Sequence, residues 1–246
     1  MGEARPMMYH ELASWWPLLS DPKEYAGEAD IFRNALDSMS ARPIATVLEL
    51  GAGGGNNALH MKRHYRMTLS DISEAMLAVS RSLNPECDHV CGDMRSLRLG
   101  RSFDAVFVHD AVGYMLTEDD LRGAMQTAFV HLEPGGPALF VPDYTAETHM
   151  PATEHGGSDT PGRSVRYLAW THAPDPGGSS YSTDFVYILT DEGGTRVLHE
   201  THRFGLFSRN QWLRLLDEVG FEAYAVPCNH STFHEGPREM FCGVRP

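Results

Sequence analysis

Acidic side chains stand at the ends of several short apolar runs in this chain. Glu49 lies in the run from 46 to 50, and Asp71, Asp93 and His109-Asp110 close three later runs. If these runs are neighbouring parallel strands, their carboxyl ends meet at one edge of a sheet, where such sheets bind ligands. Carboxylates there accept hydrogen bonds from hydroxyls and amines and attract positive charge.

Residues 47–57 read Val-Leu-Glu-Leu-Gly-Ala-Gly-Gly-Gly-Asn-Asn, which predicts a strand, a glycine turn and a helix start. Glycine lets the backbone turn sharply and approach a ligand closely, so the segment is typical of a nucleotide-binding corner. A dinucleotide loop has the spacing Gly-x-Gly-x-x-Gly, and its third glycine would fall at Asn56. Glu49 is also unfavourable beside a pyrophosphate but acceptable beside a cation. A glycine-rich turn of a generic α/β protein is the alternative.

This segment resembles motif I of the class I S-adenosylmethionine (SAM) dependent methyltransferases. SAM carries a sulfonium and an ammonium but no phosphate, which suits the acid at position 49. The resemblance covers about residues 8–145 and the last two strands. It implies that Asp71 binds the ribose hydroxyls, that Asp93 accepts from the adenine amine, and that Ile72 and Met94 cover the ring. The cofactor-binding residues that it implies are Tyr9, Tyr25, Glu49, Gly51, Ala52, Gly53, Asp71, Ile72, Met76, Asp93, Met94 and His109.

Some of these positions also have purely structural interpretations. Asp71 can cap the helix expected from about Ser73, and Ile72 and Met94 can be ordinary core residues. Asn56-Asn57 replaces the Thr or Ser-Gly of many relatives, so the contacts of the loop are open.

Two residues are candidates for catalysis. His109 lies in Phe107-Val108-His109-Asp110-Ala111-Val112-Gly113-Tyr114-Met115, which resembles the exit of the fourth strand in small-molecule methyltransferases. Tyr9, and Tyr25 in Tyr-Ala-x-Glu-Ala, resemble the N-terminal lid of antibiotic-sugar N-methyltransferases. His109 is the best general base for a hydroxyl acceptor, with Tyr9 or Asp110 behind it, whereas an amine needs no strong base. Alternatively, His109 is a structural hydrogen-bonding residue and the tyrosines are packing.

The pattern of the whole chain predicts an α/β fold. Strands and helices alternate up to residue 145, so we expect a Rossmann-like class I methyltransferase fold with a mostly parallel seven-stranded sheet and helices on both faces. Residues 8–40 are expected to form a helical lid in two parts, a first one interrupted at Pro17 and a second helix from about Pro22 to Ser38. A loop over 150–164 and three strands, an inserted antiparallel sheet, should follow strand five. We expect a lid and cofactor core over 1–145, an acceptor cap or dimerisation region over 146–207, and completion of the core over 208–246.

Composition narrows the function classes. The chain has 246 residues and a net charge of −13, which disfavours nucleic acid and anionic membranes as partners. Its four cysteines form no Cys-x-x-Cys pair, so no metal site is expected. No signal peptide or apolar span is visible, and we expect a cytoplasmic protein. The aromatic and arginine side chains of the inserted sheet also fit a homodimer interface.

Together these patterns predict a transferase that moves the SAM methyl group in line to nitrogen or oxygen of a small molecule, as in secondary metabolism. A non-catalytic SAM-binding regulatory protein is an alternative. An NAD-dependent oxidoreductase is a second alternative, although it needs the third loop glycine and a Tyr-x-x-x-Lys relay, which the sequence lacks.

Overall fold

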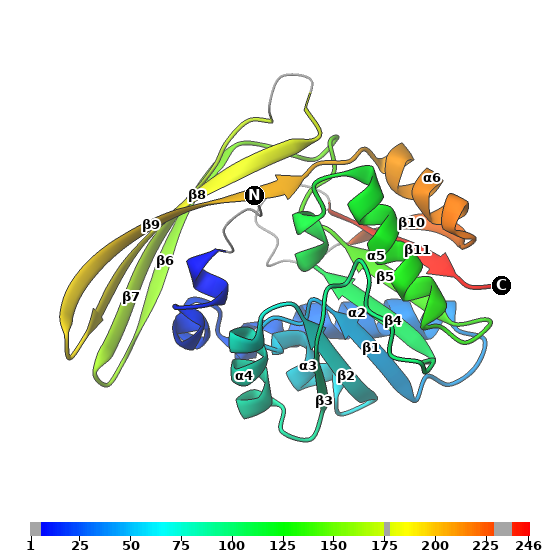
Figure 1. The fold of residues 1–246 in the computed structure, drawn as a ribbon, viewed down its shortest axis with the longest axis horizontal. Helices are drawn as coiled ribbons and strands as arrows, with labels where there is room; N and C mark the ends of the chain where they lie inside the picture. Colours follow the sequence, from blue (N-terminus) through cyan, green and yellow to red (C-terminus); the bar gives the residue numbers. More distant parts are fainter. Residues whose placement is uncertain (1–5, 175–177, 229–237) are drawn as a thin grey trace.

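The computed structural model describes residues 6–174, 178–228 and 238–246, which form two sheets (Figure 1). The larger sheet has the strand order β10-β11-β5-β4-β1-β2-β3. Its first five strands in sequence are parallel, and β11 and β10 are antiparallel additions. The predicted mostly parallel seven-stranded sheet is therefore confirmed. Its strands are β1 (Thr46–Leu50), β2 (Arg66–Asp71), β3 (Asp88–Cys91), β4 (Ala105–His109), β5 (Pro137–Val141), β10 (Glu222–Cys228) and β11 (Arg238–Val244).

Helices cover both faces of this sheet, because alternate residues of each buried strand point to opposite sides. On β4, Val106 and Val108 pack toward α5 and α6, while Ala105 and Phe107 pack toward α2 and α3. The order of strands reverses between β1 and β4, and the crevice at this switch point is where such sheets bind ligands. The helices are α2 (Ala26–Met39), α3 (Asn56–Met61), α4 (Glu74–Leu83), α5 (Glu118–Val130) and α6 (Arg209–Val219).

The helices start where the sequence supplies a cap. Ser73, Thr117 and Ser208 each accept a backbone N–H of the first turn of α4, α5 and α6. A side-chain cap of this kind stabilises a helix by about 1 kcal/mol. Gly220 ends α6 in the left-handed conformation, with φ of 111°, which glycine adopts without strain.

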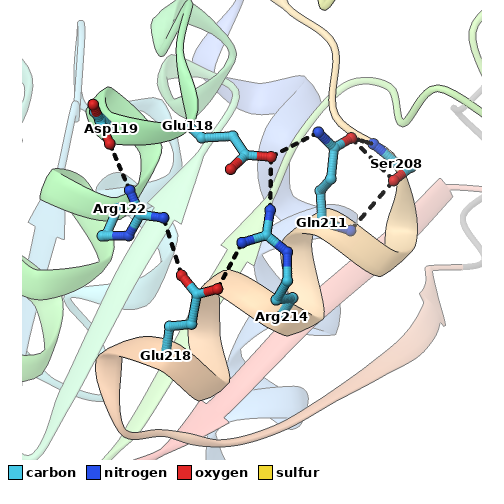
Figure 2. Close-up of polar contacts among 7 residues, drawn as sticks. All are labelled: Glu118, Asp119, Arg122, Ser208, Gln211, Arg214 and Glu218. Carbon is cyan, nitrogen blue, oxygen red and sulfur yellow. Dashed lines mark hydrogen bonds and ion pairs between the residues drawn. The ribbon is translucent and has the colours of Figure 1, made fainter.

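An ion-pair network joins α5 to α6 (Figure 2). Glu118 accepts from Arg214 at 2.7 Å, and Arg122 reaches Glu218 at 3.0 Å. Exposed pairs contribute at most about 1 kcal/mol each, so the buried Trp212 beneath them is the larger source of stability. The network joins the exposed sides of α5 and α6 at the edge of the core.

The inserted sheet is an antiparallel meander of four strands, β6 (Ala152–Thr160), β7 (Arg163–Thr171), β8 (Ser180–Asp191) and β9 (Gly194–Gly205). The prediction of a loop over 150–164 is wrong, because most of this segment forms the edge strand β6. Its Gly, Ser and Thr content disfavours a strand. However, β7 pairs with it from Ala152↔Thr171 to Thr160↔Arg163, and that pairing overrides local propensity.

The N-terminal segment lies between the inserted sheet and the core (Figure 1). Its first part consists of short turns, η1 (Met7–Tyr9), η2 (Ala13–Trp15), α1 (Trp16–Leu19) and η3 (Pro22–Tyr25). The second predicted helix, from about Pro22 to Ser38, is confirmed as η3 and α2, whereas the first helical part is a series of short turns. Pro17 and Pro22 lack the N–H that a continuous helix needs. Instead, Met8, Leu12 and Trp15 pack on the inner face of the inserted sheet.

Across the described ranges, no helix is long and apolar enough to cross a membrane.

Candidate functional site

A cavity of about 700 Å³ opens at the carboxyl ends of β1 to β4 and is covered by the N-terminal segment and by β8 and β9. This volume is typical of a small-molecule site. Every residue that the sequence nominated as cofactor-binding lines it: Tyr9, Tyr25, Glu49, Gly51, Ala52, Gly53, Asp71, Ile72, Met76, Asp93, Met94 and His109. The fold therefore brings all twelve together, although their individual roles stay predictions.

The glycine loop follows β1 and needs its glycines. Gly51 and Gly53 have φ of 76° and 52°. Residues with a side chain rarely adopt this backbone conformation. A Cβ on Gly51 would lie 2.4 Å from Cβ of Ala111. Glycine at this position therefore permits close contact between the end of β1 and the exit of β4.

Asp71 fixes the loop from the neighbouring strand. Its Oδ2 accepts the N–H of Gly53 at 2.8 Å, and its Oδ1 accepts that of Ser73 at 2.8 Å. Burial raises the pKa of Asp71, although these backbone hydrogen bonds act in the opposite direction. A carboxylate has about four lone-pair positions, so both oxygens retain capacity for ligand hydroxyls. The cap of α4 is Ser73, so Asp71 is not the N-cap of this helix.

Glu49 is the buried acid beneath the loop. It is 3% exposed, and its Oε2 has no hydrogen-bond partner. Burial raises its pKa to about 8, with Asp71 and Glu28 adding negative charge nearby. A buried acceptor without a partner is costly, and a cationic or N–H ligand in the cavity would satisfy it. This orphaned oxygen fits SAM, whose ammonium supplies such donors.

The predicted adenine site lies at the end of β3. Met94 is buried and Ile72 is 42% exposed, and both line the cavity beside Asp93. The carboxylate of Asp93 already accepts from Arg95, with Nη2 at 2.6 Å from Oδ2. Arg95 in turn reaches Asp120 at 2.8 Å. Any ligand amine therefore shares Asp93 with Arg95.

His109 is enclosed at the end of β4. Its Nδ1 lies 3.2 Å from Nδ2 of Asn57, and because that amide nitrogen is a donor, Nδ1 accepts and the proton is on Nε2. Nε2 lies 3.1 Å from Oδ1 of Asp110, yet neither atom has a hydrogen-bond partner. Burial lowers the pKa of His109 to about 4. The ring is therefore neutral near pH 7 and is a weak base.

Asp110 and Asp143 form an acid pair beside His109. Asp110 begins η4 (Ala111–Tyr114) with φ of 43°, the only described non-glycine residue at positive φ, a strain typical of functional sites. Its side chain is 46% exposed because it faces the cavity. Removal from bulk water nevertheless raises its pKa well above the usual range, and Asp143 contributes to the rise. Arg238 lies 3.2 Å from Asp143.

The tyrosines of the lid are hydrogen-bonded. Tyr25 lies 2.7 Å from the hydroxyl of Ser20, and Tyr9 accepts from Tyr114 at 2.9 Å. Burial raises the pKa of Tyr25 to about 12 and that of Tyr9 further. Both therefore remain protonated near neutral pH and act as hydrogen-bond donors rather than as bases.

The sequence did not predict a site role for several residues that line the cavity. Asn57 and Asp143 follow the glycine loop and β5, so the position at a strand end was the available signal. Tyr114 lies in a segment that the sequence singled out, but nothing marked the residue itself. His202 comes from β9, where local sequence gives no signal.

The cavity is strongly acidic. Among the described residues that line it, Arg95 is the one guanidinium. The carboxyl groups are more numerous: Glu49, Asp71, Asp93, Asp110, Asp120 and Asp143. Such walls favour a cationic ligand. Within the described ranges, no group of His, Cys, Asp or Glu side chains is arranged to hold a metal ion.

Comparison with known proteins agrees with this geometry. Residues 47–136 match the family described as methyltransferase domain. The chain is 28% identical over 225 residues to a dTDP-3-amino-3,4,6-trideoxy-alpha-D-glucopyranose N,N-dimethyltransferase of Streptomyces venezuelae, covering 90% of this chain and 92% of that protein. It is 26% identical to a dTDP-3-amino-3,6-dideoxy-alpha-D-glucopyranose N,N-dimethyltransferase of Streptomyces fradiae, covering 83% and 80%.

Solved structures show the same fold. The crystal structure of Streptomyces venezuelae DesVI superposes with a TM-score of 0.81 at 24% identity, covering all of both chains. A SAM-bound amino pentose methyltransferase from Micromonospora echinaspora gives a TM-score of 0.77 at 22% identity, also covering both chains completely. The Rossmann-like methyltransferase fold expected from the sequence is therefore confirmed.

Proposed function

We propose that the acceptor of this class I SAM-dependent methyltransferase, which acts on a small molecule, is the amino group of a nucleotide-linked sugar. The single observation that carries this proposal is the acidic cavity, which attracts both a sulfonium cofactor and a protonated amine. The names of the relatives support the same substrate class, because they act on dTDP-amino sugars.

Bound SAM supplies an electrophilic methyl carbon on its sulfonium. In the proposed reaction the bound ammonium first loses a proton to solvent. The nitrogen lone pair then forms the new N–C bond, the C–S bond breaks, and S-adenosylhomocysteine leaves with the electron pair. The methylated ammonium then loses its proton to solvent. Holding the two reactants close and in line supplies about 7–11 kcal/mol of the barrier reduction, so positioning is the main task of the cavity walls.

The protonation states of His109, Tyr9 and Tyr25 favour nitrogen over oxygen as the methylated atom. The low pKa of His109 makes it a poor acceptor of a hydroxyl proton, and the raised pKa values of Tyr9 and Tyr25 keep them protonated. An amine needs no strong base once it is neutral. We propose that Asp110 and Asp143 draw the amine to the exit of β4, beside the sulfur end of the cofactor.

The cofactor contacts are proposals on the same basis. We propose that Glu49 binds the ammonium of SAM, because one of its buried carboxylate oxygens has no hydrogen-bond partner. In this proposal Asp71 binds the ribose hydroxyls and Asp93 the adenine amine, and Gly51 and Gly53 let the backbone approach the cofactor closely. Ile72, Met76 and Met94 supply the apolar surfaces that contact the ring.

The acceptor is tested with purified protein, SAM and a dTDP-linked amino hexose, with the product analysed by mass spectrometry. We expect the mass of one or two added methyl groups, with S-adenosylhomocysteine formed in step. The matched control is the same dTDP-hexose with a hydroxyl in place of the amine, which should remain unmethylated. Methylation of the hydroxyl sugar, or of neither sugar with SAM bound, would contradict the proposal.

We also propose a homodimer that uses the outer face of the inserted sheet. Leu168, Trp170, Ile188 and Val197 are between 41% and 64% exposed there, and clustered exposed apolar side chains mark interaction surfaces. Sedimentation at several concentrations should show a dimer, and Trp170→Glu should shift it to monomer. A cytoplasmic location is the companion proposal, supported by four free cysteines.

A further inference from the structure

A polar chain runs from the inserted sheet into the upper wall of the cavity. On β9, Nε2 of His202 lies 3.1 Å from Oε1 of Glu200. The other ring nitrogen, Nδ1, lies 2.8 Å from the hydroxyl of Tyr114, and Tyr114 donates to the hydroxyl of Tyr9 at 2.9 Å. Tyr9, Tyr114 and His202 all line the cavity. Three elements distant in the sequence are thus connected at one point.

The same carboxylate also holds the N-terminal segment. Oε1 of Glu200 accepts the N–H of Met8 at 3.2 Å, and Oε2 accepts that of Met7. On the opposite side, the hydroxyl of Ser73 donates to the carbonyl oxygen of Tyr9. Tyr9 is therefore fixed at both its backbone and its side chain, between the inserted sheet and the start of α4.

Keeping Glu200 and His202 buried is costly, so their arrangement needs a reason. Glu200 is 9% exposed and His202 is 3% exposed, and taking a charged group out of water is unfavourable unless it is well paired. Burial alone raises the pKa of Glu200, but His202 and the two backbone N–H groups outweigh it and leave the pKa below its ordinary value. Glu200 therefore remains an anion inside the protein.

The direction of the hydrogen bonds has a consequence for Tyr9. Since Tyr114 gives its one proton to Tyr9, the oxygen of Tyr114 is left to accept from Nδ1 of His202. The oxygen of Tyr9 is then an acceptor from Tyr114, and the proton of Tyr9 is available to a ligand. Both ring nitrogens of His202 then carry protons, Nδ1 donating to Tyr114 and Nε2 pointing toward Glu200, and the carboxylate of Glu200 is the counter-charge of this doubly protonated ring.

We propose that Glu200 and His202 are positioning residues that hold the N-terminal segment over the cavity and fix the Tyr9 hydroxyl as a hydrogen-bond donor to the bound cofactor. The inference rests on the proposed function only in that the cavity binds SAM, and it does not depend on the acceptor. They act through Tyr114 and through the backbone of Met7 and Met8.

The first measurement is hydrogen exchange of the segment 6–20, read by mass spectrometry, in Glu200→Gln. Loss of the charge weakens both backbone hydrogen bonds, and we expect exchange in this segment to become at least tenfold faster. Unchanged exchange would overturn the holding role. Asp184→Asn is the matched control, because Asp184 lies in β8 of the same sheet and contacts His172 and His199 but not the N-terminal segment.

The second measurement separates holding from orientation. Tyr114→Phe removes the link between His202 and Tyr9 but leaves Glu200 on Met7 and Met8. We expect S-adenosylhomocysteine to bind about tenfold more weakly by calorimetry, while exchange of the segment 6–20 stays as in the wild type. Unchanged affinity would overturn the orientation role.

A third variant protects the test against a simple folding defect. His202→Asn retains a nitrogen donor near the place of Nδ1 but loses the contact with Glu200, so we expect it to recover part of the affinity that His202→Ala loses. Equal affinities in the two variants would contradict orientation through Nδ1. If the wild type binds S-adenosylhomocysteine but methylates no amino sugar, the acceptor proposal fails while this inference stands.

Discussion

The two halves of the cavity are built from contacts of very different range. In the floor, which the strand ends of the large sheet form, Asp71 accepts a hydrogen bond from Gly53, 18 residues away in the sequence, and Asp93 accepts one from Arg95, two residues away. In the roof, which the N-terminal segment and the inserted sheet form, Tyr114 donates to Tyr9, 105 residues away in the sequence, and Glu200 accepts from Met8, 192 residues away. The floor is therefore specified by local motifs, whereas the roof exists only after the inserted sheet, the β4 exit and the N-terminal segment have assembled.

Asp71→Ala should give the largest loss, because it removes a contact that organises the floor. Two backbone N–H groups lose their acceptor, and the ribose hydroxyls lose their proposed partner. Since a hydrogen bond to a charged group is worth roughly 1.5–3 kcal/mol, we expect S-adenosylhomocysteine to bind at least about a hundredfold more weakly by calorimetry. Asp71→Asn, which retains one acceptor, should lose less. Unchanged affinity in Asp71→Ala would remove Asp71 from the cofactor site.

The floor could be predicted from the sequence because each of its parts is a strand end followed by a polar residue. Glu49, the glycines, Asp71 and Asp93 all follow that rule, and parallel strands bring their ends together. The roof follows no such rule. Glu200 and His202 sit in an alternating strand that reads equally well as a half-buried sheet, and β6 reads as a loop until β7 pairs with it. The sequence shows that Asn57 is an unusual residue for this loop but cannot predict its contacts, because its partners Glu28 and His109 come from different elements.

Asp110→Asn tests the boundary between floor and roof. Asparagine tolerates positive φ better than most residues, so the turn at the β4 exit should survive. Loss of the charge should raise KM for the amine acceptor about tenfold, equivalent to roughly 1.4 kcal/mol, and leave cofactor affinity unchanged. Steady-state kinetics with calorimetry separates the two. Loss of cofactor affinity with an unchanged acceptor KM would place Asp110 on the cofactor side instead.

Glu49→Gln probes the floor through pH. The pKa of Glu49 is about 8 in the ligand-free protein. Below that pH the carboxyl group is protonated, and a cationic ligand must displace its proton in order to bind. In the wild type we expect the affinity for S-adenosylhomocysteine to rise by up to about tenfold per pH unit as pH approaches 8. Glu49→Gln should be weaker and flat with pH by calorimetry. A pH-dependent affinity that persists in Glu49→Gln would assign the titration to another group.

The same substitution should stabilise the ligand-free protein. The folded pKa of Glu49 lies above its unfolded value, so the free energy of unfolding that it contributes falls as pH rises from about 4.3 toward 8. A neutral glutamine avoids that loss. We expect Tm of ligand-free Glu49→Gln to exceed that of wild type at pH 8 and to match it near pH 4, by thermal melts. Opposite changes in stability and affinity are typical of a residue kept for binding.

His109→Gln should have the smallest effect on activity, because His109 is too weak a base to accept a proton from the acceptor. With a pKa of about 4 the ring is neutral across the working range, and its contacts are with Asn57 and with the rings of Phe32 and Phe107. If the acceptor is an amine, general-base catalysis is not needed, and we expect kcat to fall less than about fivefold, well below the roughly 10²–10⁴-fold typical of a lost general base. The pH–rate profile should keep its shape. A hundredfold loss of kcat with an altered profile would restore His109 as the base and would favour oxygen over nitrogen as the methylated atom.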